Sequence, residues 1–466
     1  MKPVDDFLTD ASGFIWGPWL LIPLLLLTGL YLTVLLRGIQ VRRFRLAFWL
    51  AFIKRSDADK ADVAGDISHY QALATALAAT VGVGNIAGVA TAIALGGPGA
   101  VVWMWFTGMV GMATKYSEAF LGVRFRRTDA AGEQSGGPMH YLRRGIKGPL
   151  GIFLGGFFAI AGAFAAFGIG NMTQANAVAA NVKDEWGLDP AITGVIITVL
   201  TAVVILGGIK SIGRVTSAFV PMMIVLYILG AAAVLALNIG EVPAAIGLIF
   251  ADAFTGTAAT GGFAGAGVAA AIQYGVARGI FSNESGLGTG GIAAAAAKTT
   301  HPVRQALVSM TQTFIDTLIV VSFTALTIVV TGVWKEGGKD EAATFTGRAF
   351  DAGLPGEWGS VIVTVSVIFF AFSTLLGWSY YGERCMEYLF GRRAVLPYRL
   401  IFILVAYVGA TTTLTTVWTF SDVMNGLMAL PNLIGLLILS PLVYRETREY
   451  FRNRPVEDER VRTTKE

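Results

Sequence analysis

The sequence predicts an all-α membrane protein with about eleven transmembrane helices. Of its 466 residues, 54% are hydrophobic and only 14% are charged, whereas soluble globular proteins carry roughly 25% charged residues. Apolar stretches of about 20 residues, the length that crosses the hydrocarbon core, follow one another with charges between them. The 57 glycines fit this class because helices in lipid pack closely through small residues.

Hydropathy and charge divide the chain into spans and short connections. The first apolar run follows three aspartates, where a cleaved signal peptide would carry basic residues, so we expect it to remain as a span. The expected spans are 16–37, 70–95, 99–123, 150–180, 190–208, 214–238, 262–297 (interrupted), 302–332, 357–388, 397–416 and 420–444.

Basic residues cluster in alternate connections, all on one side of the predicted spans. Positive residues mark the cytoplasmic side, so we expect a multi-pass protein of the cell (inner) membrane with the N-terminus outside and the C-terminus in the cytoplasm. The clusters are Arg42/Arg43/Arg45/Lys54/Arg55, Arg124/Arg126/Arg127/Arg143/Arg144, Lys210/Arg214, Lys298/Arg304, Arg384/Arg392/Arg393 and the tail from Arg445.

Several function classes are disfavoured by the residues. Because the basic residues sit in short connections rather than on one face, we expect no nucleic-acid partner. The chain has one cysteine and three scattered histidines, which cannot build a disulfide framework or a Cys/His metal cluster. A membrane enzyme would need a convergent catalytic set, and a channel would need a continuous polar stripe or ring of charges. We find neither, and nothing requires an oligomer.

Without the first span, ten helices remain and divide into two groups of five. A repeat with an odd number of spans must insert with inverted topology. We therefore expect an N-terminal helix and basic linker over 1–68, a first five-helix repeat over 69–240, a second, inverted repeat over 241–446 and a tail over 447–466.

Each group of five opens with a span rich in helix breakers, Thr80-Val-Gly-Val-Gly-Asn85 in one and Gly275–Glu284 in the other. Non-helical backbone is tolerated at membrane depth only where it is buried in protein or lines a cavity. Matching interruptions in two halves indicate a transport site. The alternatives are that the glycines only allow helix packing, or that Gly82–Ala87 is a dinucleotide motif, which would need a preceding strand.

Several segments carry a family likeness, namely 76–100, 103–106, 111–118, 168–174, 279–286 and 372–383. These segments resemble the alanine or glycine:cation symporter family, and the resemblance covers nearly the whole chain apart from its two ends. It implies sodium coupling and a LeuT-type fold, which agrees with the five-plus-five division.

A transported amino acid needs donors for its carboxylate, acceptors for its ammonium group and a wall for its side chain. Amides freed at a broken helix suit a carboxylate, and side-chain amides recognise polar groups at moderate desolvation cost. The alternatives are interhelical hydrogen bonding for the amide side chains and packing for the aromatic ones. The substrate candidates are Thr80, Gly82, Val83, Gly84, Asn85, Asn171, Gln174, Gly279, Phe281 and Trp378.

For sodium, the ninth span offers the hydroxyls of Ser373 and Thr374 at mid-depth. The resemblance places them against carbonyls of the first break, with Thr80 and Val83 as the expected partners. The alternative is that each hydroxyl bonds to its own helix. By the same resemblance, Asn85 falls where some LeuT-type proteins complete a second cation site.

Charged residues inside spans are expensive and should be paired, line a cavity or serve the function. Lys115 and Glu118 are three residues apart and are expected to form an ion pair. Arg278 and Glu284 flank the second break and are candidates for a gating pair. Asp316 is a candidate to neutralise a cation or to carry a proton.

The sequence therefore predicts a symporter that imports a small neutral amino acid, alanine or glycine, together with Na+ by alternating access in the lipid bilayer. The alternative is a proton-coupled amino-acid transporter, in which Asp316 or Glu284 would carry the proton.

Overall fold

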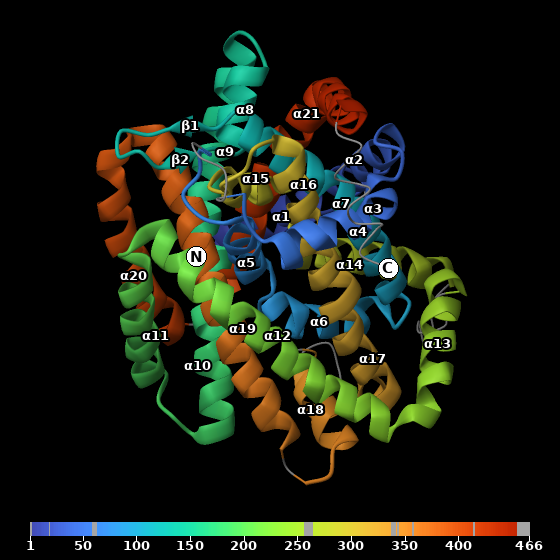
Figure 1. Cartoon of the computed structure of the whole chain (residues 1–466). Helices are drawn as coiled ribbons and strands as arrows, with labels where there is room; N and C mark the ends of the chain where they lie inside the picture. Colours follow the sequence, from blue (N-terminus) through green and yellow to red (C-terminus); the bar gives the residue numbers. More distant parts are fainter. Residues whose placement is uncertain are drawn as a thin grey trace.

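The computed structural model describes residues 2–17, 19–57, 63–255, 264–336, 342, 344–356, 358–412 and 415–453. These residues form a helical bundle whose long helices run along its height (Figure 1). Its strands are one short antiparallel hairpin, β1 (Arg127–Thr128) and β2 (Gln134–Ser135), which lies at the upper end beside α8 (Pro138–Gly145).

Each of the eleven predicted spans corresponds to a helix or to an interrupted pair of helices. Six continuous helices of the described residues are long and apolar enough to cross a membrane, and α2, α6 and α11 are shorter apolar helices. In chain order the spans are α2 (Leu21–Leu35), α5 (His69–Thr80) with α6 (Ala87–Gly96), α7 (Ala100–Arg124), α9 (Pro149–Phe167) with α10 (Thr173–Trp186), α11 (Pro190–Ile205), α12 (Gly208–Leu237), α14 (Ala264–Asn283) with α15 (Thr289–Ala295), α16 (Pro302–Thr313) with α17 (Ser322–Thr331), α19 (Gly359–Phe390), α20 (Val395–Thr411) and α21 (Thr415–Asn453).

Helices outside these spans were not predicted, because hydropathy over a membrane-length window does not detect short or mixed segments. The longest at the N-terminus is α1, which packs on α21, and the indole nitrogen of Trp16 just beyond it donates to the carbonyl of Asp422 at 2.9 Å. The additional helices are α1 (Lys2–Ile15), α3 (Ile39–Arg42), α4 (Phe44–Phe48), the π-helix η1 (Trp49–Lys54), α8, α13 (Val242–Thr255) and α18 (Phe345–Gly353).

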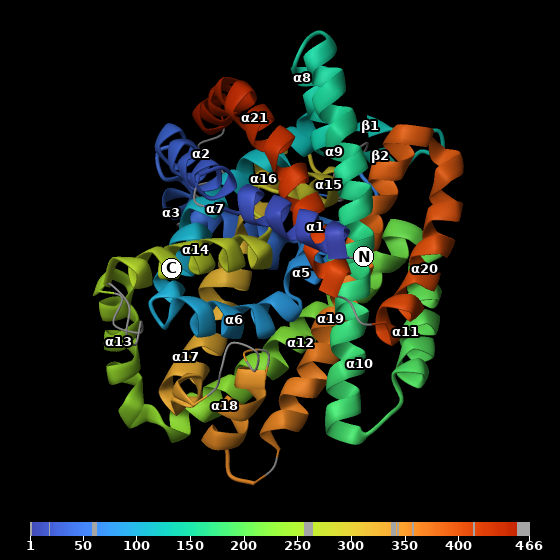
Figure 2. The same cartoon turned by 180° about the vertical axis from the view of Figure 1, so that it is seen from behind.

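The first predicted interruption is confirmed, whereas the second lies further along the chain than predicted. The predicted segment Gly275–Glu284 is helical up to Asn283, and Gly275 instead lets α14 approach α7, since a Cβ there would lie 2.4 Å from the carbonyl oxygen of Ala100. The first separates α5 from α6 and contains a single 3₁₀ turn, η2 (Val83–Asn85). The second separates α14 from α15, and its residues Glu284, Gly286 and Gly288 all have left-handed backbone conformations. Figures 1 and 2 agree that α6 and α14 run beside each other across the middle of the bundle. Two further spans contain π-helical turns, η3 (Gly168–Met172) and η5 (Phe314–Val321).

Glycines bring both interrupted helices into backbone contact with their neighbours. A Cβ on Gly377 of α19 would lie 2.7 Å from the Cα of Ala79 in α5, and one on Gly122 of α7 would lie 2.2 Å from the carbonyl oxygen of Gly291 in α15. Small residues allow this approach in helix packing within lipid. The contact between α19 and α5 sets Ser373 against the end of α5.

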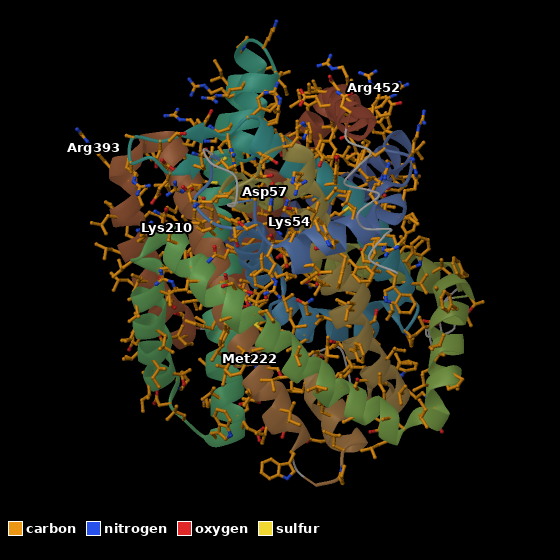
Figure 3. All side chains as sticks on the ribbon, in the orientation of Figure 1. Lys54, Asp57, Lys210, Met222, Arg393 and Arg452 are labelled. Atoms are coloured by element: carbon orange, nitrogen blue, oxygen red, sulfur yellow. The ribbon has the colours of Figure 1, made fainter. Side chains whose placement is uncertain are left out.

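The two ends of the bundle differ in charge. Arg393 and Arg452 lie near the upper end in Figure 3, and Lys54 and Lys210 lie in the upper half. The lower end carries α18 and the connection between α10 and α11 (Figure 1). The predicted basic clusters therefore gather toward the end that bears the β-hairpin.

Candidate functional site

A cavity of about 510 Å³ enters from the lower end of the bundle and reaches the first break. Acidic residues Asp184 and Asp351 line it, and so do Val83, Gly84 and the aromatic ring of Phe281. A Cβ on Gly84 would lie 3.1 Å from the Phe281 ring, so only glycine leaves normal contact there. The cavity thus connects one end of the molecule with the interrupted backbone at its centre.

At the first break, side-chain amides occupy the freed backbone donors. The amide nitrogen of Gly82 donates to Oδ1 of Asn85 at 2.9 Å, and that of Val83 is 3.4 Å from Oε1 of Gln174. These acceptors are neutral, and a carboxylate accepts more strongly from backbone N–H groups than an amide oxygen does. The predicted grouping of Gly82, Val83, Asn85 and Gln174 is therefore present in the structure.

Asp316 links the two breaks. Its Oδ1 accepts from Asn85 of the first break at 2.8 Å, and its Oδ2 accepts from Ser282, at the end of α14, at 2.8 Å. Oδ2 also accepts from the hydroxyl of Thr317 at 2.8 Å, and the carboxylate is fully buried. Within the described residues it has no cationic side chain within ion-pair distance. Neutral donors therefore hold a buried negative group between the two interrupted helices.

Five oxygen atoms converge where α19 meets the end of α5. The hydroxyl of Ser373 lies 3.2 Å from the carbonyl oxygen of Ala78, 3.4 Å from that of Val81 and 2.8 Å from that of Phe370. The hydroxyl of Thr374 also donates to the carbonyl of Phe370, at 3.0 Å. Carbonyl oxygens at the C-terminal end of an interrupted helix are ligands of the kind that transporters offer to Na+, and the hydroxyls add two further oxygen atoms. We call these five atoms the oxygen cluster.

The oxygen cluster corrects the expected partners of Ser373 and Thr374. The neighbouring carbonyls belong to Ala78 and Val81, two residues before the predicted Thr80 and Val83. The hydroxyl of Thr80 bonds instead to the carbonyl of Ala76 at 3.1 Å and accepts from Nε2 of Gln312 at 3.0 Å. The register differs because α5 remains helical up to Thr80, so its last turn faces Ser373. The glycine turn also approaches α19, since a Cβ on Gly82 would lie 2.4 Å from the hydroxyl of Thr374.

The second break is held by Glu118 of α7. Its Oε1 accepts from the backbone amides of Gly286 at 2.9 Å and Gly288 at 3.0 Å, and from the side chain of Asn432 at 2.9 Å. The predicted ion pair with Lys115 is confirmed at 3.6 Å, and the Lys115 ammonium also donates to the carbonyl of Glu284 at 3.0 Å. This pair therefore replaces the helical hydrogen bonds that the break removes.

The expected pairing of Arg278 with Glu284 across the second break is not formed among the described residues. The carboxylate of Glu284 accepts instead from the indole nitrogen of Trp378 at 2.8 Å and from the hydroxyl of Thr289 at 2.6 Å. The guanidinium of Arg278 lies 5.6 Å from the centre of the Phe281 ring and lines the cavity. The two residues point to different parts of the site because Arg278 lies more than one helical turn before the break.

Three substrate candidates, Asn171, Gly279 and Trp378, make packing or interhelical contacts in the structure. Nδ2 of Asn171 donates to the carbonyl of Phe402 in α20 at 2.6 Å. This is the interhelical hydrogen bond that was expected from the sequence as the alternative to substrate binding. A Cβ on Gly279 would lie 2.4 Å from the hydroxyl of Thr107, so this glycine allows α14 to approach α7. Neither residue lines the cavity. Trp378 is buried, and a Cβ on Gly170 would lie 2.2 Å from the Cβ of Trp378. The indole therefore packs between η3 and Glu284.

Gln312 and Ser282 were missed, although they contact the first break and Asp316. Gln312 donates to Thr80, and its Nε2 is also 3.3 Å from the carbonyl of Asn283. A signal was available in the sequence, because Gln305, Ser309, Gln312 and Asp316 recur every three or four residues along one apolar span. That spacing places them on one face of a helix and predicts a polar face toward the protein interior.

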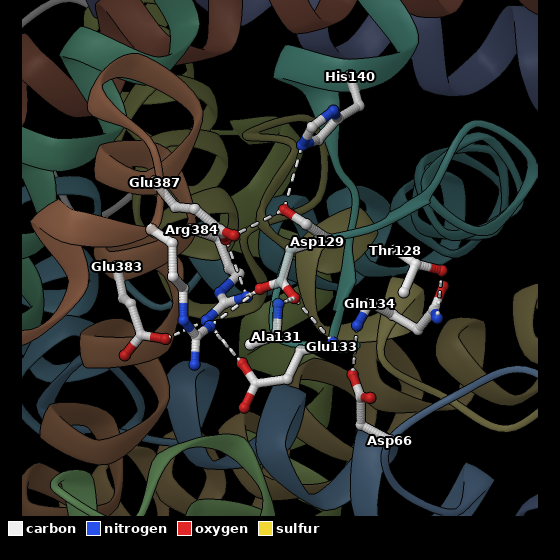
Figure 4. A network of polar contacts seen from close by, with 12 residues as sticks. Asp66, Thr128, Asp129, Ala131, Glu133, Gln134, His140, Glu383, Arg384 and Glu387 are labelled. Carbon is white, nitrogen blue, oxygen red and sulfur yellow. Dashed lines mark hydrogen bonds and ion pairs between the residues drawn. The ribbon is translucent and has the colours of Figure 1, made fainter.

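The opposite end of the bundle is closed by two ionic networks. In Figure 4 the guanidinium of Arg384 lies among the carboxylates of Asp129, Glu133, Glu383 and Glu387, joining α19 to the β-hairpin. Hydrogen bonds and nearby charges, chiefly from Arg392 and Arg384, outweigh burial and hold the pKa of Glu133 below its usual value.

The second network is centred on Asp57, which precedes α5. Its carboxylate accepts from Nε and Nη2 of Arg304 at 2.8 and 2.9 Å and lies 3.2 Å from Nε2 of His69. Burial alone would raise the pKa of Asp57, but its bonds to His69 and Arg304 lower it well below the usual range. This network fixes the beginning of α5 to the beginning of α16.

The interrupted helices, the cavity that ends at one of them and the closed opposite end define an all-α membrane transporter. The fold resembles the solved structure of MhsT in complex with L-phenylalanine, with a TM-score of 0.56 at 15% identity, over 81% of this chain and 97% of that one. The family model of the sodium:alanine symporter family matches residues 1–464, and the chain belongs to that family.

Curated relatives match over nearly the whole chain. The sodium/alanine symporter AgcS of Methanococcus maripaludis is 53% identical over 448 residues, which cover 96% of this chain and 97% of that protein. A sodium/proton-dependent alanine carrier protein of Bacillus sp. strain PS3 is 33% identical over 82% of this chain and 88% of its own length.

Removing Glu118 should destabilise the fold through the second break. In Glu118→Ala the ammonium of Lys115 stays buried without its partner, and two backbone amides lose their acceptor, which should cost about 3–5 kcal/mol. The double variant Lys115→Met/Glu118→Ala should lose less than the sum of Lys115→Met and Glu118→Ala, because no charge is left unpaired. Thermal unfolding of the four purified proteins measures the coupling. Strictly additive losses would contradict the role assigned to the pair.

Proposed function

We propose that this chain imports a small neutral amino acid, alanine or glycine, together with Na+ by alternating access. The observation that carries the proposal is the cavity that ends at the first break, next to the oxygen cluster formed with α19. An amino acid at the break and a cation at the cluster would share one interrupted helix. Binding of either ligand would then order the backbone that the other one uses.

The substrate carboxylate would bind the amides of Gly82 and Val83, displacing the neutral acceptors Asn85 and Gln174. Phe281 would cover the side chain, and its close contact with Gly84 leaves room for a small substrate only. Na+ would bind the oxygen cluster, where the carbonyl oxygens of Ala78 and Val81 would be two of its ligands.

The orientation that we propose places the end with the β-hairpin and α8 in the cytoplasm, following the positive-inside rule. The cavity would then open to the outside, and the networks around Arg384 and Asp57 would close the cytoplasmic side. The described structure would be an outward-facing conformation, ready to accept both ligands.

One sodium ion supplies enough energy for accumulation. A monovalent cation moving across about 100 mV gives about 2.3 kcal/mol, and a tenfold concentration gradient adds about 1.4 kcal/mol. Together they support accumulation of the substrate by several-hundred-fold.

A second candidate is coupling to protons, favoured by one observation. Asp316 is a buried carboxylate held by neutral donors from both breaks, so its charge would respond to, or affect, the arrangement of the two helices. A proton on Asp316 would remove a buried charge at the centre of the site.

Uptake of labelled alanine and glycine into proteoliposomes tests the function directly. Sodium, potassium and proton gradients are imposed one at a time, and we expect accumulation with an inward sodium gradient only. Uptake without any gradient would contradict symport. Accumulation driven by a pH gradient without sodium would transfer the coupling to the proton.

The oxygen cluster predicts separate effects on sodium and substrate. Ser373→Ala and Thr374→Ala should each raise the sodium concentration for half-maximal uptake by about tenfold, because each removes one oxygen ligand worth about 1.4 kcal/mol. The matched control is Ser366→Ala on the same helix, since its hydroxyl bonds to the carbonyl of Ile362 at 2.7 Å. An unchanged sodium dependence in both cluster variants would exclude this site.

Asp316→Asn tests the link between the two breaks. The amide cannot accept through both groups as the carboxylate does, and hydrogen bonds to a charged group are worth about 1.5–3 kcal/mol. Sodium-driven uptake should therefore fall by about tenfold to a hundredfold. Asp351→Asn, which makes the same change among the residues that line the cavity, should transport nearly as the parent does. If Asp316→Asn instead retains full uptake and loses only a response to pH, proton coupling is supported.

A further inference from the structure

A second cavity lies at the upper end of the bundle, between the end of α2, α3 and the last turns of α21. Its volume is about 130 Å³, and four arginines line it, Arg37, Arg42, Arg43 and Arg448. None of the described residues that line it is acidic. The floor is apolar, with Leu36 and Ile39 buried.

The arginines of this cavity differ from the others at the same end. Arg304, Arg384 and Arg392 are each paired with carboxylates. Arg37, Arg42 and Arg448 are exposed, and among the described residues no carboxylate lies within ion-pair distance of them. Arg42 is 3.4 Å from the carbonyl of Arg37. Like charges held this close repel one another, so an anion in the cavity would relieve the repulsion.

The cavity is held in place by contacts between the two chain segments that form it. The guanidinium of Arg43 lies 4.2 Å from the centre of the Phe451 ring. The hydroxyl of Thr447, on the cavity wall, is 2.9 Å from that of Tyr116, which ties α21 to α7. Two turns before Thr447, the hydroxyl of Ser440 is 3.1 Å from that of Tyr31 in α2. A ligand at the arginines would therefore join α2 and α3 to α21.

An apolar stripe on α2 leads to the cavity. Leu27, Leu30 and Val34 are 63%, 44% and 69% exposed, and they are spaced three and four residues apart, along one face of the helix. Arg37 follows three residues after Val34, where α2 has ended. Val41 of α3, which is 68% exposed, continues beside it. An arginine-lined cavity beside an exposed apolar helix face fits a ligand with an anionic head and apolar chains better than it fits a free anion.

We propose that this cavity binds the phosphate headgroup of an anionic phospholipid, whose acyl chains lie along the exposed face of α2. Basic pockets between helices at the cytoplasmic surface bind anionic headgroups in this way. The lipid would stabilise the packing of the first span against the C-terminal helix. This inference uses the orientation proposed above, but lipid binding is measured without transport.

The experiment compares the full chain with two triple variants in a neutral detergent. Arg37→Gln/Arg42→Gln/Arg448→Gln removes three charges from the cavity. The control Arg143→Gln/Arg144→Gln/Lys147→Gln also removes three positive charges. Two of them lie in α8 and the third just after it, at the same end of the bundle but outside the cavity. Native mass spectrometry counts bound lipid, and thermal unfolding is followed with phosphatidylglycerol, phosphatidylcholine or inorganic phosphate added.

Phosphatidylglycerol should remain bound to the parent and to the α8 control and should raise their Tm, whereas phosphatidylcholine should not. The cavity variant should lose more than half of both effects. Equal retention by the two triple variants would overturn the proposal, and so would an equal stabilisation by inorganic phosphate, since the ligand would then be a free anion. The variant Arg37→Lys/Arg42→Lys/Arg448→Lys shows that a loss does not reflect misfolding, because it should regain part of the binding.

Discussion

The structure depends on one constraint, that a backbone donor or acceptor inside a membrane must find its partner within the protein. The two interrupted helices break this rule locally and are supported by different means. At the first break the partners are neutral side-chain amides from Asn85 and Gln174. At the second they are the carboxylate of Glu118 and the ammonium of Lys115, both buried. Neutral partners can be displaced at low cost, whereas a buried ion pair cannot. This difference supports the ligand site that we propose at the first break.

This difference explains where charge is tolerated in the bundle. Lys115 and Glu118 are expensive in an apolar span, but the break that they support would otherwise leave unsatisfied amides at Gly286 and Gly288. Asp316 has no such partner among the described cations, and it is stabilised by donors from Asn85, Ser282 and Thr317. Its hydrogen bonds span both breaks, so movement of one interrupted helix relative to the other changes the surroundings of a buried charge.

Much of this organisation could be predicted from sequence, because membrane-length apolar runs, basic connections and paired glycine-rich interruptions are properties of single segments. The spans and the two breaks follow from them. The partners across helices do not follow, since they depend on rotation and depth. Ser373 was expected against Thr80 and Val83, but α5 stays helical to Thr80 and presents Ala78 and Val81 instead. Asn171 was expected at the substrate, but its helix turns that amide toward α20. Short helices such as α1 and α13 escape detection because they are not long enough to span.

The coupling that we propose between ion and substrate rests on the position of the oxygen cluster. It joins α5, which begins beside Asp57 and ends at the first break, to α19, which carries Arg384 at its other end. In the proposed mechanism, opening the closed end would move α5 and α19 relative to each other. The same movement would change the distances within the ionic networks and within the oxygen cluster. A ligand with equal affinity for both conformations does not change their populations. Changing the ratio of the two conformations from 1:99 to 99:1 requires that the ligand bind one of them about 5.5 kcal/mol more tightly than the other. In the mechanism that we propose, sodium bound between two helices that remain in contact would order the break without opening the far end. The substrate, at the position that we propose for it, would contact both interrupted helices and supply the remaining preference.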